Sequence, residues 1–198
     1  METLLKEDVP GRVRFRRRAG ADIAARIARF ASPATRLLLA GDGLTTTSLQ
    51  AWAGGPMRVL EAEHGRVPRS RAPAGAAELL EQGPGDVPLL LRRSLLAGPG
   101  GRVWSANVVV AGPGVPEEAL ACLRGDVPLG QALQAAGLGC RRTLADAGSG
   151  EAFWAGGPAA FRCYVLRHRS RPLAVVCESF NPRLVDARTV APGREDAW

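Results

Sequence analysis

The chain lacks any apolar run long enough to cross a membrane. A membrane-spanning helix needs about 20 predominantly apolar residues, whereas apolar runs such as RLLLAG and VPLLL are far shorter. The first residues, METLLKEDVPGRVRFRRR, include acidic side chains and no apolar segment before a small-residue cleavage site. They do not have the pattern of a secretion signal. We therefore expect a cytoplasmic protein with no membrane partner.

Metal-binding patterns are missing as well. The four cysteines never form a C-x-x-C pair and have no histidine nearby, and the chain has only two histidines, His64 and His168. A zinc site is not expected, and the cysteines fit small, reduced, buried apolar residues. The GPGG segment lacks the G-x-G-x-x-G spacing and precedes a strand, so it is not a phosphate loop. We expect no metal.

Aromatic residues make up only 5% of the chain, which leaves few rings for stacking on nucleic-acid bases. The net charge of +7 and a pI near 10.4 would suit nucleic acid. The basic residues, 25 arginines and one lysine, are nevertheless scattered, and only RVRFRRR at 12–18 forms a dense cluster. We expect no nucleic-acid partner.

The length of 198 residues and the hydrophobic content of 46% fit one globular domain. We assign residues 1–20 to a flexible basic arm, 21–187 to the domain and 188–198 to a flexible tail. No internal repeat is present, and helices, strands, a helix pair and further strands follow one another. This order predicts a single α+β domain with a largely antiparallel sheet flanked by helices.

Periodicity and turn residues place the elements along the chain. Thr45 is the predicted N-cap of the third helix. A loop rich in Pro, Gly and Ala is expected at about 70–86. Helices are expected within 21–31, 32–40, 45–53, 116–124 and 128–137, and strands within 56–69, 87–98, 103–112, 140–148 and 161–180, the last a pair that turns near HRSRP.

The segment LAVVCESFNP at 173–182 places a carboxylate, Glu178, on an apolar strand. Alternation puts Glu178 on one face with Ala174, Val176 and Phe180, so a solvated position is disfavoured. Burying a carboxylate is costly without a partner. A desolvated Glu178 would have a raised pKa and could donate a proton. The alternative is a structural ion pair with an arginine, Arg92 or Arg142.

Five segments together resemble the chorismate pyruvate-lyase family, including its actinobacterial branch that forms 4-hydroxybenzoate. They are RLLLAGDGLTTTSLQ, VPLLLRRSLLAG, VWSANVVVAG, DVPLGQAL and RPLAVVCESFNP, and they lie between about Thr35 and Val185. The resemblance implies a six-stranded antiparallel sheet flanked by helices and enclosing a ligand cavity. It also implies a monomer that converts chorismate to 4-hydroxybenzoate and pyruvate without a cofactor.

The resemblance assigns the site as follows. Arg92 receives the ring carboxylate, Glu178 meets the oxygen at the far end of the ring, and the backbone N–H groups of Leu44 and Leu129 help to hold the carboxylate. Chorismate is a dianion, and a guanidinium can bind a carboxylate bidentately. Alternation turns Arg93 to the opposite sheet face from Arg92. Without the resemblance, both arginines would be expected on the surface of an edge strand.

The chain departs from the family pattern at two places. Where the family commonly has a basic residue after GLT, this chain has Thr46, Thr47 and Ser48, and Asn107 stands where some relatives have arginine. These changes concern how a pyruvyl carboxylate would be held. We name Arg142, in CRRTL, as a donor that could replace these basic residues in holding that carboxylate.

The expected function is therefore a chorismate lyase that serves quinone or specialised-metabolite biosynthesis. A non-catalytic domain that binds an aromatic acid is the alternative, because the fold resembles the effector-binding domains of certain bacterial transcription regulators. Such domains follow a winged helix, for which about forty residues before the match are too few. The third possibility is a lyase-like enzyme that acts on another enol or aromatic substrate in a biosynthetic cluster. The presence of both Arg92 and Glu178 favours catalysis.

Overall fold

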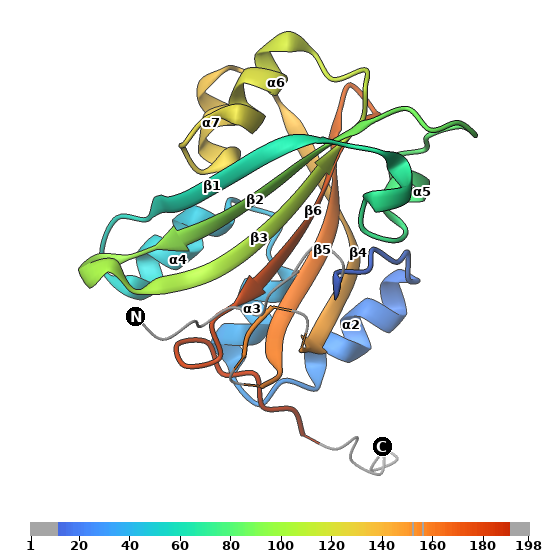
Figure 1. Ribbon diagram of the computed structural model, residues 1–198. Helices are drawn as coiled ribbons and strands as arrows, with labels where there is room; N and C mark the ends of the chain where they lie inside the picture. The colour runs from blue at the N-terminus through green and yellow to red at the C-terminus, as the bar shows by residue number, and fades with distance from the viewer. Residues whose placement is uncertain (1–11, 152, 156, 191–198) are drawn as a thin grey trace.

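The computed structural model describes residues 12–151, 153–155 and 157–190. One six-stranded sheet runs through the molecule in the order β1-β2-β3-β6-β5-β4, and every pair of neighbouring strands is antiparallel (Figure 1). The predicted α+β class with a sheet of about six strands is confirmed. The strands are β1 (Arg58–Val67), β2 (Leu89–Ala97), β3 (Val103–Ala111), β4 (Cys140–Gly150), β5 (Ala159–His168) and β6 (Arg171–Phe180).

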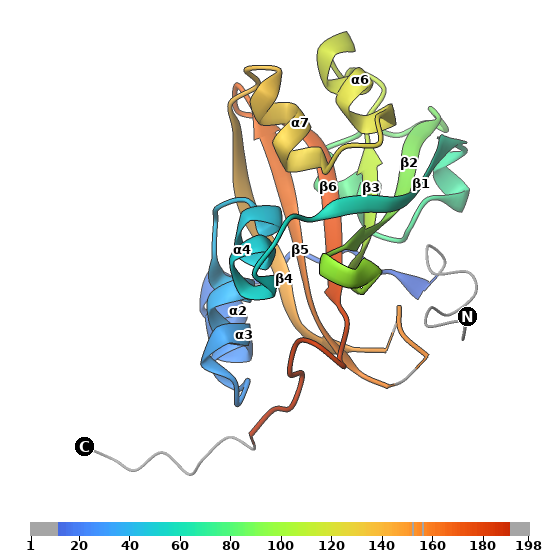
Figure 2. The same cartoon turned by 90° about the vertical axis from the view of Figure 1, so that its left-hand side faces the viewer.

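Helices cover both faces of the sheet unequally. Figure 2 shows α3, α4 and α7 on one side of the sheet and α5 on the other. None of the described helices is long and apolar enough to cross a membrane. The helices are α2 (Gly20–Ala28), α3 (Pro33–Ala40), α4 (Thr45–Ala53), α5 (Ala76–Leu79), α6 (Glu117–Arg124) and α7 (Leu129–Ala135), with short 3₁₀ turns at Arg69–Arg71 and Pro99–Gly101.

The segment expected as a loop at about 70–86 contains α5. Ala76, Ala77 and Leu79 of this helix are buried in the core on the side of the sheet that faces away from α4 and α7. Ala and Leu have high helix propensity, and the apolar contacts favour one short turn of helix between the flanking Gly and Pro residues.

The described part of the expected N-terminal arm is packed onto the domain, and residues 1–11 lie outside the described residues. Val13 and Phe15 are buried in the same core as α5. The Phe15 N–H donates to the carbonyl of Ala74 at 2.8 Å. Gly75 has φ +82°, and a Cβ there would collide with the Phe15 carbonyl, so this close approach requires glycine. Within this arginine-rich segment, Val13 and Phe15 are two residues apart and so point to the same side of the extended chain.

The expected C-terminal tail is held at its start. The Ala31 N–H donates to the Arg188 carbonyl at 3.0 Å, and the Val190 N–H donates to the Arg29 carbonyl at 2.8 Å. Residues 191–198 of that tail lie outside the described residues.

The face of the sheet that carries α4 and α7 holds two separate hydrophobic clusters. Val176 of β6 packs with α6 and α7, whereas Phe180 packs with α2, α3 and α4. Glu178 lies between them on the same strand face, and Cys177 faces the opposite core, as the alternation predicts. The gap between the clusters is where a cavity forms.

We predict that Phe15 contributes strongly to stability, because truncating a buried phenylalanine costs about 3–5 kcal/mol. Phe15→Ala should lower the free energy of unfolding in urea by this amount, whereas Arg17→Ala, an exposed neighbour, should change it by less than about 0.5 kcal/mol. Equal effects of the two substitutions would contradict the packing of this segment onto the sheet.

Candidate functional site

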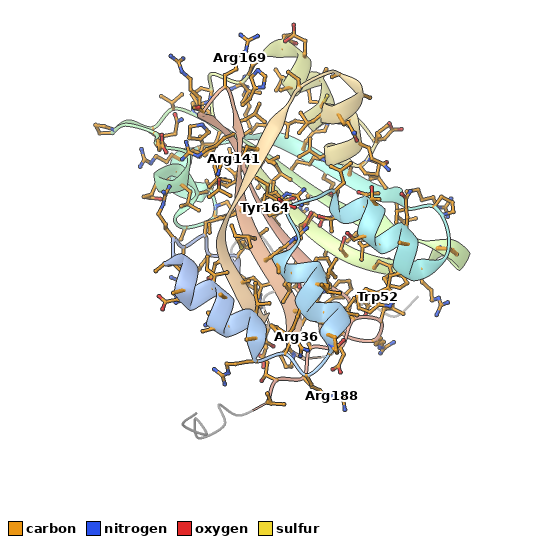
Figure 3. The ribbon with its side chains drawn as sticks, turned by 180° about the vertical axis from the view of Figure 1, so that it is seen from behind. Arg36, Trp52, Arg141, Tyr164, Arg169 and Arg188 are labelled. Atoms are coloured by element: carbon orange, nitrogen blue, oxygen red, sulfur yellow. The ribbon has the colours of Figure 1, made fainter. Side chains whose placement is uncertain are left out.

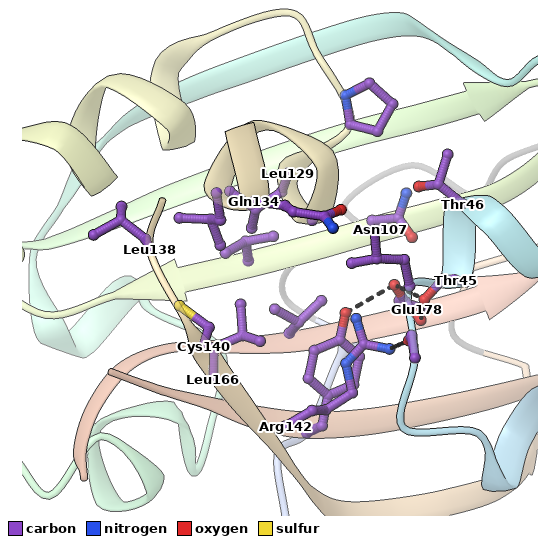
Figure 4. Close-up of a pocket in the computed structure, with 18 of the residues that line it drawn as sticks. Thr45, Thr46, Asn107, Leu129, Gln134, Leu138, Cys140, Arg142, Leu166 and Glu178 are labelled. Atoms are coloured by element: carbon purple, nitrogen blue, oxygen red, sulfur yellow. Dashed lines mark hydrogen bonds between the residues drawn. The ribbon is translucent and has the colours of Figure 1, made fainter. Parts of the chain in front are cut away.

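A cavity of about 460 Å³ lies above the sheet between α4 and α7 (Figure 4). Leucine and valine side chains from the sheet, α7 and the segment after it form much of its wall. Polar groups are concentrated in the gap between the two clusters. The polar and charged side chains that line the cavity are Asp42, Thr45, Thr46, Ser94, Asn107, Gln134, Arg142, Tyr164 and Glu178.

Strand register aligns part of this polar set across the sheet. Asn107 of β3 is paired with Ser94 on β2 and with Glu178 on β6. The Asn107 Nδ2 donates to the Ser94 carbonyl at 3.4 Å, and its Oδ1 is buried without a partner among the described residues. A buried acceptor of this kind is costly unless a ligand or water supplies a donor.

Glu178 is the centre of a buried hydrogen-bond network. Arg162 of β5 donates from Nε to Oε2 at 2.9 Å, and Tyr164 donates from its hydroxyl to Oε1 at 2.8 Å. The Thr45 hydroxyl lies 2.8 Å from both carboxylate oxygens and accepts from Arg162 Nη2 at 2.6 Å. Tyr164, labelled in Figure 3, is buried. The carboxylate is therefore saturated and paired.

This network selects the second of the two expected states of Glu178, the ionised partner of an arginine. Burial alone raises the pKa of Glu178, but the charges of Arg162 and Arg142 and the hydrogen bonds from Arg162 and Thr45 outweigh it. The net pKa lies below the ordinary value, so Glu178 is ionised at neutral pH. Burial and the Glu178 charge together raise the pKa of Tyr164, which stays neutral as a donor.

The ion pair predicted as the alternative exists, but its arginine is Arg162 rather than Arg92 or Arg142. Arg162 is 1% exposed, and its Nη1 donates to the carbonyls of Leu38 and Gly41 at 2.7 Å each. These carbonyls belong to the end of α3, where a cation is favourable. Arg162 thereby joins Glu178, α3 and the start of α4.

The sequence predicts Thr45 as the N-cap of α4. In the structure the N-cap is Leu44, and Thr45 is the first residue of the helix. The Thr45 side chain is used by the Glu178 network instead. The first N–H of this segment that closes a helical bond is that of Ser48, to the Leu44 carbonyl. The N–H groups before it in α4 are left for other acceptors, as is usual at a helix N-terminus.

Arg142 is the cavity arginine without a carboxylate partner within ion-pair distance among the described residues. Its guanidinium stacks over the Tyr164 ring, 4.2 Å from the ring centre, and Nη1 donates to the Gly43 carbonyl. Its Nε is buried without a partner in the described part of the chain. Arg142 therefore retains both charge and a free donor beside the start of α4.

Leu44 and Leu129, which the resemblance names for their backbone, both line the cavity. Each lies at the start of a helix, α4 and α7, and the two helices meet at the cavity. A Cβ at Gly130 would lie 2.8 Å from Leu44 Cδ2. The glycine therefore permits the close approach that brings the two helix ends together.

Arg92 is on the same sheet face but is not among the cavity-lining residues that the structure describes. It is 1% exposed and donates to the carbonyls of Cys122 and Val127 at 3.2 Å each. A guanidinium at the end of α6 satisfies carbonyls that the helix leaves free. Arg92 thus holds α6 and the segment that leads into α7. Arg93 lies on the opposite sheet face, as expected, and forms an ion pair there with Glu63.

Sequence reasoning missed Arg162 and Tyr164. Both lie on β5 with alternating spacing, and register pairs Arg162 with Glu178. The signal that could have found them is the occurrence of a charged and a phenolic residue on one face of an apolar strand next to the strand of Glu178. No group of three or more His, Cys, Asp or Glu side chains within the described residues could hold a metal ion.

Comparisons with known proteins show the fold. No family model and no curated protein matches the chain. A GntR-family transcriptional regulator matches with a TM-score of 0.52 and 15% identity over 77% of this chain and 68% of that chain. PhnF from Mycobacterium smegmatis matches with a TM-score of 0.49 and 12% identity over 78% and 71%. The C-terminal domain of the histidine utilization repressor from Pseudomonas syringae matches with a TM-score of 0.43 and 11% identity. That match covers 68% of this chain and 98% of that domain.

Identities this low support a conclusion about the fold only. The chain shares its single-domain α+β fold, with one antiparallel sheet flanked by helices, with the matched GntR-family regulator. The fold that the resemblance implied is confirmed.

We predict that the Arg162–Glu178 pair makes stability depend on pH. The folded-state pKa of Glu178 is depressed, so the stabilisation is complete above the unfolded pKa, about 4.3, and is lost as pH falls through the folded pKa. The difference in the free energy of unfolding between wild type and Glu178→Gln should therefore be largest near pH 7 and shrink towards pH 3.

Two variants complete this test. Arg162→Met should cost about 3–5 kcal/mol at pH 7, since it leaves a buried carboxylate unpaired. Glu63→Gln, in the exposed pair with Arg93, should cost less than about 1 kcal/mol. A pH-independent difference for Glu178→Gln would contradict the ionised, paired state.

Proposed function

We propose that the chain is a small-molecule-binding domain whose cavity takes an aromatic or enol carboxylic acid. The observation that carries this proposal is that Arg142 lines the cavity with no ion-pair partner among the described residues. Glu178 is neutralised by Arg162, while Arg142 faces the cavity with no carboxylate within ion-pair distance among the described residues. Arg142 therefore presents a guanidinium and a free Nε donor to the cavity, and an anionic ligand would pair with it.

The carboxylate of the ligand would bind at Arg142 and the start of α4. The N–H groups that precede Ser48 in this helix lie beside the Gly43 carbonyl that Arg142 contacts. Free N–H groups, the helix dipole and a guanidinium all favour an anion. Thr46, which is buried and lines the cavity, adds a hydroxyl to the site, beside Asn107 in Figure 4.

The rest of the ligand would lie against the apolar wall. Leu133, Leu166 and Val176 line the cavity below α7 and suit the faces of a planar ring. At the sheet, Asn107 Oδ1 is a free acceptor that suits a ligand hydroxyl. This arrangement favours an acid with a second polar group on the ring.

Binding without reaction is favoured over lyase activity by the states of the two expected catalytic residues. Glu178 is ionised and fully hydrogen-bonded, so it is not poised as a proton donor. Arg92 is occupied by two backbone carbonyls. The α+β fold is compatible with binding alone, since the matched regulator has the same fold.

The proposal predicts that a carboxylate is required for binding. In isothermal titration calorimetry, 4-hydroxybenzoate should bind wild type, and Arg142→Gln should weaken binding about tenfold or more, the loss expected for a charge-assisted hydrogen bond. Arg141→Gln is the matched control, because Arg141 is the exposed neighbour of Arg142 on the same strand. It should leave the affinity within about twofold.

A neutral analogue sharpens the test. 4-Hydroxybenzyl alcohol keeps the ring and its hydroxyl but has no carboxylate, so it should bind weakly to wild type and to Arg142→Gln alike. Equal affinity of wild type for the acid and the alcohol would contradict the proposed role of Arg142.

Chorismate lyase activity is the second candidate, and one observation favours it. Glu178 and the starts of α4 and α7 surround one cavity, as the resemblance implies for three of its four site residues. In such a reaction the ionised Glu178 could accept a hydrogen bond or proton. Incubation with chorismate and a coupled pyruvate assay separates the candidates. Pyruvate release that is abolished in Glu178→Gln would establish the lyase, and binding without pyruvate would establish the binding domain.

A further inference from the structure

A second cleft, of about 200 Å³, lies on the face of the sheet opposite the cavity. Phe161, Cys177 and Ser179 form its floor, and alternation along β5 and β6 turns these side chains away from Arg162 and Glu178. Residues 12–18, α2 and β4 form its walls. Five arginines line it: Arg12, Arg14, Arg16, Arg18 and Arg26.

One carboxylate orients two of these arginines. Asp146 is 3% exposed, accepts from Arg18 Nε at 2.7 Å and lies 3.7 Å from Arg26 Nε. Arg26 Nε also donates to the Ala147 carbonyl at 2.6 Å. Both side chains therefore use Nε to fix the guanidinium. Among the described residues their terminal nitrogens have no hydrogen-bond acceptor, and these nitrogens form the fork that binds oxyanions.

Gly148 makes room for this arrangement. A Cβ on Gly148 would collide with Nη2 of Arg26. The guanidinium of Arg26 therefore lies directly against the backbone of β4, and this position would be lost with any larger residue. Gly148 is a positioning residue for Arg26.

The remaining three arginines project from the N-terminal segment. Val13 and Phe15 point into the core, so alternation turns Arg12, Arg14 and Arg16 outward to line the cleft. None of the three has a hydrogen-bond or ion-pair partner among the described residues. Among the cleft-lining residues that the structure describes, five guanidinium groups therefore face one carboxylate, that of Asp146, which pairs with Arg18 and Arg26.

We propose that this arginine cleft is a second ligand site, which binds a small multivalent anion of the phosphate-ester or pyrophosphate class. Phosphate oxygens match the guanidinium fork, and several arginines around a small concave site favour more than one negative charge. The volume suits a compact group rather than a polymer. The site is separated from the cavity by the sheet and does not depend on the function proposed for the cavity.

Calorimetric titration of the full chain with pyrophosphate at constant ionic strength tests this proposal. Wild type should bind, and Arg14→Gln/Arg16→Gln should weaken binding about tenfold or more. Both residues are exposed, so the fold should be preserved, which circular dichroism would verify. The matched control is Arg141→Gln/Arg171→Gln. It removes two exposed arginines at the starts of β4 and β6, whereas the cleft lies towards the ends of these strands. It should change the affinity by less than about twofold.

Further variants distinguish binding at this cleft from binding in the cavity and from nonspecific attraction of an anion to a basic protein. Gly148→Ala should weaken pyrophosphate binding by displacing Arg26, and Arg142→Gln should leave it unchanged. Absence of binding to wild type, or an equal loss in the double variant and its control, would overturn the proposal. Binding of duplex DNA but not pyrophosphate, lost in the double variant, would also overturn it and assign the cleft to nucleic acid.

Discussion

The site of this protein depends on one buried ion pair, between Arg162 and Glu178. Removing a carboxylate from water is favourable only when charge and hydrogen bonds compensate it, and here Arg162, Thr45 and Tyr164 together do so. Arg162 also bonds the end of α3. The pair therefore fixes where α3 ends and α4 begins, and with them the wall of the cavity. Loss of either charge would affect both the stability of the domain and the shape of its site.

Local sequence signals were sufficient for most of the fold. Alternation in β6, the turn near HRSRP and the Ser32–Pro33 helix start depend on neighbouring residues, and each was predicted correctly. Residues 12–18 were assigned to a flexible arm because arginines outnumber apolar residues there. Val13 and Phe15 are nevertheless buried, and their partners in the core are distant in sequence. The short helix α5 was missed for a related reason, since its stability comes from burial rather than from a long periodic pattern.

The site could be predicted only in part, since its contacts span most of the chain. Glu178 was located by pattern and by resemblance, but its contact with Thr45 joins residues 133 positions apart, and no local rule predicts it. The sequence left the protonation of Glu178 open between a raised pKa from burial and an ion pair with an arginine, and Arg162, which decides between them, was not identified. The position of Arg92 illustrates the same limit: the strand face was predicted, while the carbonyls that bind its guanidinium come from an element whose placement the sequence does not specify.

The separation of the two hydrophobic clusters on one sheet face has a consequence for how the domain can change. Val176 and Phe180 of β6 belong to different clusters, and the cavity lies between them. Substitutions at cavity positions such as Asn107 and Thr46 therefore leave both clusters intact. The polar residues in this gap can be exchanged without removing an apolar side chain from either cluster, so this architecture can change the polar groups that it presents to a ligand while its apolar core is kept.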